Sequence, residues 1–507
     1  MSDESLCFAQ HYHERTKYDP QTIDSKSKPL DWDAQPLSFK EYKFGATIDL
    51  KPYLDPKVEP SWWSRISRLL YASYGITARV RTLNGESIFL RSAPSAGGLY
   101  PAEIYLISRG TPELAAGLYN YQVRTHSLLR FWDSDVWRSL QEASFWHRSL
   151  DRTQLAIATT AVFYRSQWRY QDRAYRRINL DTGHLLGNIE LASALNDYRP
   201  HLIGGFSDMA ANKLLYLDPE TEGTVAIVAL ADLREIEHHI THDKSALPSQ
   251  TTTDYPKLEE GELLAYLHRV SQIDTEPKQQ DRAASTPDES PEDDKYNFPF
   301  CTKVTTATPP IDWGENSIGL EKTLFERRST REYTGGSISL TQLQLLLDFT
   351  YQPKHYVSRG LDNDPDYFDL DSIETFIAVT AVEGLDDGCY YYAPKAQELR
   401  QVRFKNFRRE LHFLCLGQPL GRDAAVVLFH TADLARAVGK YGERAYRYLH
   451  LDAGHLGQRL NLAAIHLGLG ASGIAGFFDD RVNEVLGIPE DEAVIYITTL
   501  GEPKLGR

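Results

Sequence analysis

The chain of 507 residues contains one long segment twice, and this internal repeat limits what the chain can fold into. Tyr170–Leu185 reads YQDRAYRRINLDTGHL, and Tyr441–Leu456 reads YGERAYRYLHLDAGHL. The separation is constant: His184 and His455 lie 455 − 184 = 271 positions apart, and the same difference holds as far as Asn212. A repeat that keeps its register over this length is a whole domain and not a solenoid unit. We therefore expect two domains of one fold.

The composition is that of an ordinary globular protein, with 42% hydrophobic and 25% charged residues. The net charge is −15 and no basic stripe is present, which argues against nucleic-acid binding. The start, Met1–Ser5, has no basic region followed by an apolar run, and no apolar stretch reaches the ~20 residues of a membrane helix. We expect a cytoplasmic protein without membrane contact. No metal site is expected, because neither a CxxC pair nor zinc-ligand spacing occurs around the four cysteines, Cys7, Cys301, Cys389 and Cys415.

The expected organisation has four parts: an N-terminal extension of unassigned role, a first domain, a linker region and a second domain, at residues 1–60, 61–245, 246–319 and 320–507. In the linker region, one helix is expected over Leu258–Val270. The stretch Asp274–Asp294 contains almost no apolar residue and is expected to be disordered. Gly468–Gly473 fits the GxGxxG pattern, but it follows a helical segment instead of a strand. It therefore predicts a helix end and a turn, not a dinucleotide site.

Two segments offer groups suited to a cofactor. Arg327, Ser329 and Arg331 place guanidinium groups and a hydroxyl close together, which suits a phosphate. The alternative is a solvent-exposed helix face that carries several arginines. In the first copy, Arg91–Pro101 is rich in small residues that let backbone amides approach a flat ligand. The alternative there is a tight turn before a strand. The second copy has Phe368–Ile373 in that place and has lost the small residues.

These motifs together resemble a known family. The Arg-Arg-Ser-x-Arg opening at Arg327–Arg331, the segment Pro94–Pro101, the strand Gly117–Tyr121 and the Lys440-Tyr441 pair are similar to flavin-dependent nitroreductase-fold proteins. More narrowly they resemble the azoline dehydrogenases of ribosomal peptide natural products, and the two-copy length resembles the cyanobactin thiazoline oxidases most. The resemblance implies an α+β fold of tandem nitroreductase-like domains. Each has a mostly antiparallel sheet flanked by helices, and the two form an intrachain pseudo-dimer.

The resemblance also implies FMN at the interface of the two copies. Arg327, Ser329 and Arg331 would hold its phosphate, ribityl chain and ring edge. The first copy's Pro94, Ser95, Ala96 and Gly97 would line the ring, and the second copy's Ile474, Ala475 and Gly476 would approach it. One site would combine these parts with Lys440 and Tyr441. The other, with Phe368–Ile373, is expected to hold no flavin.

Lys440 and Tyr441 are the predicted catalytic residues. Aromatising a thiazoline removes a hydride and a proton, and the flavin takes the hydride, so a side chain must take the proton. A neutral Lys or a tyrosinate could do so. The first copy has Arg169-Tyr170 instead, and an Arg stays protonated. The alternative for Lys440 and Tyr441 is a surface lysine and a packed tyrosine.

The resulting hypothesis is an FMN-dependent oxidase that converts peptide thiazolines, or oxazolines, to azoles, with oxygen reoxidising the flavin as the family implies. Its partners would be an azoline-containing precursor peptide and the heterocyclase of the same pathway, and a homodimer is left open. Two alternatives stand beside it. One is a general NAD(P)H-dependent flavin nitroreductase, and the other is a non-catalytic peptide-binding subunit.

Overall fold

The computed structural model describes residues 6–23, 29–55, 57–81, 85, 87–235, 245–277 and 293–504. Two seven-stranded sheets organise it, and all their strand pairs are antiparallel. In spatial order the first contains β1 (Ala46–Asp49), β6 (Ser127–Trp132), β5 (Gly117–Gln122), β4 (Ala102–Ser108), β7 (Leu155–Val162), β9 (Glu222–Asp232) and β8 (Tyr198–Ile203). The second contains β10 (Lys303–Thr305), β15 (Glu398–Arg403), β14 (Gly388–Ala393), β12 (Glu374–Val379), β16 (Val426–Asp433), β18 (Glu492–Gly501) and β17 (Gly470–Ile474).

The helices also recur in the two halves. The first half has α3 (Trp62–Tyr74), α4 (Trp137–Ala143), α5 (Phe163–Tyr170), α6 (Ala174–Ala194) and α7 (Asp208–Leu214). The second has α10 (Ile318–Glu326), α11 (Leu340–Tyr351), α12 (Arg408–Leu414), α13 (Pro419–Asp423), α14 (Leu434–Tyr441), α15 (Ala445–His466) and α16 (Asp479–Leu486). Two small sheets complete the fold, β2 (Ile76–Arg81) with β3 (Ser87–Arg91) and β11 (Ile338–Ser339) with β13 (Val382–Glu383). The expected α+β class and the tandem arrangement are confirmed.

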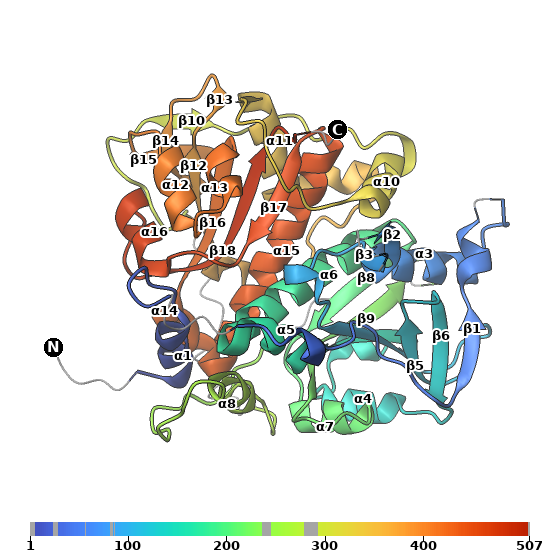
Figure 1. Ribbon diagram of the computed structural model, residues 1–507. Helices are drawn as coiled ribbons and strands as arrows, with labels where there is room; N and C mark the ends of the chain where they lie inside the picture. Colours follow the sequence, from blue (N-terminus) through green and yellow to red (C-terminus); the bar gives the residue numbers. More distant parts are fainter. Residues whose placement is uncertain are drawn as a thin grey trace.

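The helices α6 and α15 lie together where the two halves meet (Figure 1). Nearly every residue of both is buried, which is typical of a helix surrounded by protein on all sides. They cross at Gly183 and Gly454, which are equivalent in the repeat. A Cβ on Gly183 would lie 2.2 Å from the carbonyl oxygen of Leu451, so the crossing needs glycine. The close crossing makes the two domains one interlocked body.

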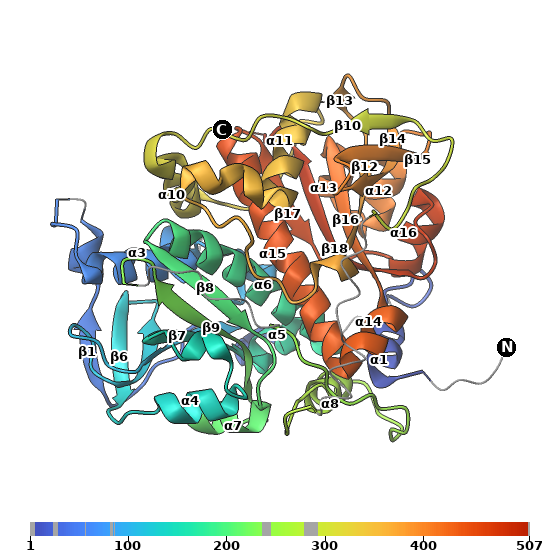
Figure 2. The same ribbon diagram turned by 180° about the vertical axis from the view of Figure 1, so that it is seen from behind.

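The N-terminal extension joins this interface. Its helix α1 (Phe8–Thr16) lies beside α14 and α8 (Leu263–Val270), as both views show (Figure 1, Figure 2). The backbone amides of Phe8 and Ala9 donate to the carboxylate of Glu443 at 3.1 and 2.6 Å. The N-terminal extension therefore has a structural role that its polar sequence did not suggest.

Parts of the sheets lie outside the predicted domains. Strand β1 falls within residues 1–60 and β10 within 246–319, and both pair at sheet edges. The helix predicted over Leu258–Val270 begins only at Leu263. Most of the stretch Asp274–Asp294 is outside the described residues.

The glycine-rich segment Gly468–Gly473 begins with the predicted helix end and turn, and its residues from Gly470 onward belong to strand β17. Helix α15 ends at His466, Gly468 follows with φ of 75°, and β17 begins at Gly470. Within the described part of the chain, no helix combines the length and the apolar character needed to cross a membrane.

The crossing of the central helices predicts a stability difference between two glycine substitutions. Gly183→Ala should lower the free energy of unfolding by about 1–3 kcal/mol, because its Cβ meets backbone that cannot yield. The control is Gly439→Ala in α14, where nothing lies within 4 Å of an added Cβ, so stability should be unchanged or higher. Urea unfolding of both variants measures this, and equal stabilities would contradict the close crossing.

Candidate functional site

Two buried ion-pair clusters set the relative position of the copies. Asp479 of the second copy pairs with Arg173 and Arg176 of the first at 3.0 and 2.7 Å. By the repeat, Asp208 of the first copy pairs with Arg444 and Arg447 of the second at 2.6 and 3.0 Å. Burial opposes ionisation of both aspartates, but the arginines outweigh it and hold the pKa of each below its usual value. These clusters fix the starts of α6 and α15. The candidate flavin site and its equivalent in the other half lie next to them.

The small-residue loop of the first copy is positioned by hydrogen bonds to a carboxylate on α6. Asp181 accepts hydrogen bonds from Ser95 Oγ at 2.6 Å and from the amide of Ala96 at 3.1 Å. Burial raises the pKa of Asp181 to about 7, although these bonds and Arg177 act in the opposite direction. Gly97 has φ of 65°, and the loop is partly exposed from Pro94 onward. The loop can therefore present its backbone to a flat ligand.

Arg327 brings the second copy to this loop. Its guanidinium donates to the carbonyl oxygen of Ser92 at 2.5 Å and to that of Arg91 at 3.1 Å, and its Nη1 lies 3.5 Å from Ser329 Oγ. No described carboxylate forms an ion pair with it, and burial lowers its pKa to about 10. A buried cation that lacks an anion fits a phosphate-bearing ligand. Arg331 is exposed nearby.

The remaining wall comes from α6 and the end of β17. Arg177 is buried, and its Nη1 has no hydrogen-bond partner among the described residues. Its Nη2 lies 3.6 Å from the position that a Cβ on Gly476 would take. Arg173 reaches the carbonyl oxygen of Ala475 at 3.4 Å. Ile474 points into the core of the second domain, so only its backbone is available to a ligand. An unpartnered donor between a small-residue loop and a glycine fits the polar edge of a flavin.

The structure does not bring Lys440 and Tyr441 to this site. Lys440 Nζ pairs with Asp369 of its own copy at 2.9 Å. Tyr441 packs edge-on against Tyr448, which stacks on Phe368. This arrangement corrects the predicted composite site. The residue pair before each central helix stays with the loop of its own copy, because Asp181 and its equivalent Asp452 each bind the loop of their own copy.

Arg169 and Tyr170 occupy the position predicted for Lys440 and Tyr441. A Cβ on Gly97 would lie 2.8 Å from the hydroxyl oxygen of Tyr170 and 3.4 Å from Cδ of Arg169. The guanidinium of Arg177 lies 3.9 Å from the centre of the Tyr170 ring. Burial raises the pKa of Tyr170, although Arg177 and Arg169 oppose the shift.

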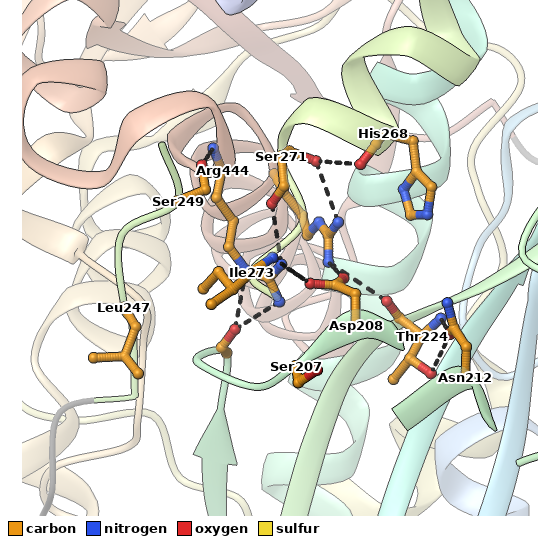
Figure 3. A network of polar contacts seen from close by, with 12 residues as sticks. Ser207, Asp208, Asn212, Thr224, Leu247, Ser249, His268, Ser271, Ile273 and Arg444 are labelled. Carbon is orange, nitrogen blue, oxygen red and sulfur yellow. Dashed lines mark hydrogen bonds and ion pairs between the residues drawn. The ribbon is translucent and has the colours of Figure 1, made fainter. Parts of the chain in front are cut away.

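The equivalent site in the other half is filled by the chain itself. The amides of Gly204 and Gly205 donate to the carbonyl oxygen of Ser245 at 2.6 and 2.9 Å. Leu247 lies where a side chain on Gly205 would be, since its Cγ is 2.4 Å from the built Cβ. The amide of Arg444 donates to Ser249 Oγ at 3.0 Å, and Figure 3 shows Leu247 and Ser249 on one segment beside this arginine. A flavin would have to displace this segment.

Sequence reasoning missed Asp181, Arg177 and the filling segment. Asp181 belongs to the repeated Leu-Asp-x-Gly-His sequence, so its presence in both copies was a usable signal. Arg177 stands where the second copy has Tyr448, a difference within the repeat that also marks the divergence. The segment 245–252 carries no pattern that could have revealed its position.

Comparison with known proteins gives matches over both halves. A family model described as "Nitroreductase family" matches residues 64–232 and 324–502. A crystal structure of a putative nitroreductase from Anabaena variabilis ATCC 29413 is 64% identical, covers 98% of this chain and 100% of that one, and superposes with a TM-score of 0.93. "Putative nitroreductase MJ1384" of Methanocaldococcus jannaschii is 32% identical over 34% of this chain and 86% of its own length. "Trifolitoxin-processing protein TfxF" of Rhizobium leguminosarum bv. trifolii is 29% identical over 26% of this chain and 43% of its own length.

The candidate site predicts which arginines bind FMN. Arg327→Ala and Arg331→Ala should each raise the Kd for FMN about tenfold to hundredfold, because one charge-assisted phosphate contact is worth about 1.5–3 kcal/mol. Lys43→Ala, which removes an exposed cation of the N-terminal extension, should leave the Kd unchanged. Flavin fluorescence titration of each variant provides the Kd. An unchanged Kd in both arginine variants would contradict the phosphate assignment.

Proposed function

Because the chain belongs to the nitroreductase family, we propose that it is an FMN-dependent oxidoreductase with one flavin site, which oxidises thiazolines of a peptide to thiazoles. The observation that carries the flavin assignment is the buried guanidinium of Arg327, which has no carboxylate partner among the described residues and lies beside the small-residue loop of the other copy. Arg327, Ser329 and Arg331 would hold the phosphate and ribityl chain. Arg177 and the loop amides would hold the ring.

The peptide substrate is supported by similarity and by the layout of the site. One relative is named for the processing of trifolitoxin, and it matches this chain over part of its length. In this chain, the loop at Gly97 and Gly98 is exposed and adjoins a pocket, so a bulky substrate can reach the flavin ring. The same layout would admit an oxazoline.

The proton acceptor in this proposal is Tyr170. When bound, the flavin supplies the acceptor for the hydride that leaves the thiazoline ring. The proton on the adjacent carbon must go to a side chain, and Arg169 stays protonated. The Tyr170 hydroxyl lies against Gly97. Burial raises the pKa of Tyr170, and the guanidinium of Arg177 over its ring opposes that rise and so stabilises the ionised form that takes the proton. Tyr170 therefore replaces Lys440 and Tyr441 as the proposed catalytic residue.

A second candidate is an NAD(P)H-dependent nitroreductase. It is favoured by Arg169, because the candidate flavin site has this arginine where the azoline dehydrogenases have the lysine of their Lys-Tyr pair. Mass analysis of a thiazoline peptide after incubation, with and without NADPH, separates the two. Loss of two hydrogens without NADPH supports the oxidase, whereas NADPH consumption with an unchanged peptide supports the reductase. A purified protein without flavin absorbance would instead indicate a non-catalytic peptide-binding subunit.

The assignment of the base is tested by two matched tyrosine substitutions. Tyr170→Phe should retain FMN yet lose about 10²–10⁴-fold in thiazoline oxidation, the usual contribution of a positioned base. Tyr441→Phe, the equivalent change in the filled half, should keep both flavin and activity. Turnover is measured beside the flavin spectrum of each variant. If Tyr170→Phe is active and Tyr441→Phe is inactive, the proton acceptor is not Tyr170 but lies at Lys440 and Tyr441.

A further inference from the structure

A pocket of about 360 Å³ lies beside the candidate flavin site. It is bounded by the N-terminal extension around Arg15–Tyr18, by Arg169–Arg173 at the start of the first central helix, and by Leu416 of the second copy. Apolar side chains of Ile23, Leu30 and Leu263 complete its walls. The pocket therefore draws on both domains and on a part of the chain outside the matched family regions.

The pocket reaches the position where the flavin ring is expected. Tyr170 lines it and also touches Gly97 of the small-residue loop. Leu416 and Tyr18 line it and lie 3.2 and 3.9 Å from the position of a Cβ on Gly476. A molecule in this pocket would be held next to both walls of the flavin site.

The charges in the pocket are unevenly balanced. Lys17 pairs with Glu14 and Asp480 at 2.8 and 2.6 Å, and Arg173 pairs with Asp479. Asp172 accepts the amides of Gly261 and Leu264 at 2.6 and 3.0 Å, so its charge is also engaged.

Three charges remain without such partners. Arg15, Arg169 and Glu260 are exposed and form no ion pair with another described residue. The pocket therefore contains two exposed guanidinium groups, those of Arg15 and Arg169, that have no carboxylate partner among the described residues and are available to an anionic ligand.

We propose that this pocket binds a carboxylate-bearing segment of the peptide substrate, with Arg169 pairing with an acidic side chain next to the ring that is oxidised. This inference rests on the proposed function and names the substrate class. Arg169 lines the pocket and lies beside the loop that would hold the flavin. Its planar fork pairs with a carboxylate in a bidentate manner, which the lysine at the equivalent position 440 cannot do. The apolar walls of the pocket, formed by Ile23, Leu30 and Leu263, would contact an aliphatic residue next to the acidic residue of the peptide.

The test uses the FMN-loaded enzyme and two short peptides that carry one thiazoline flanked by either Glu or Gln. The wild-type enzyme should have a KM about tenfold to hundredfold lower for the Glu peptide, the value of one charge-assisted pair. Arg169→Gln should raise the KM of the Glu peptide to that of the Gln peptide, and any change in kcat through the pKa of Tyr170 should be equal for the two peptides. Arg138→Gln, an exposed arginine of α4 that pairs with Glu142, is the control and should change nothing.

Equilibrium binding of the same peptides, labelled with fluorescein and followed by anisotropy, separates this inference from the proposed function. If neither peptide is oxidised but Glu binds tighter than Gln and Arg169→Gln removes the difference, the pocket stands and the oxidation proposal fails. If both peptides bind the wild-type protein equally, the inference is overturned. It is also overturned if Arg169→Gln lowers kcat for both peptides with unchanged KM, because Arg169 would then serve the reaction and not the carboxylate.

Discussion

The paired burial of Asp479 and Asp208, each between two arginines of the other copy, is the interaction on which the structure depends. Removing the aspartate from such a cluster leaves two buried arginines without an opposite charge, which costs about 3–5 kcal/mol. The clusters lie at the starts of the two central helices, one helical turn before Arg177 and Tyr448. They thereby set which loop, which strand end and which tyrosine meet. Arg173 also holds the carbonyl oxygens of Thr16 and Ala475, so the N-terminal extension and β17 are fixed by the same group.

One symmetric framework gives two different sites because the residues at equivalent positions differ. On one side, Arg177 Nη1 has no hydrogen-bond partner among the described residues, and Gly97 has no side chain to fill the space. On the other, Tyr448 stacks on Phe368 at 4.8 Å and its hydroxyl donates to the carbonyl oxygen of Leu247 at 2.9 Å. Aromatic and aliphatic side chains thus occupy the volume that a flavin would need. The functional consequence is that a duplicated fold retains one candidate flavin site, and its other half serves as support.

The repeat could be predicted from the sequence itself, because its two copies match without a gap. The antiparallel sheets and the meeting of Arg327 with the Ser95 loop were expected only from the resemblance to a known family. The prediction failed for Lys440 and Tyr441, since in a pseudo-symmetric pair the pattern does not say which of two sites a residue faces. That choice depends on Asp181 and Asp452 binding the loops of their own copies, a long-range contact. The edge strands β1 and β10 were missed because short, exposed strands have no hydrophobic alternation to recognise.

A crystal structure of the protein with FMN tests the central claim most directly. The account predicts one flavin, with its phosphate at Arg327, its ring between Arg177 and the Ser95–Gly97 loop, and Tyr170 beside it. Leu247 should still fill the other half. A flavin that lies against Phe368 and Lys440, with the segment 245–252 displaced, would contradict both the assignment of the site and the proposed catalytic tyrosine.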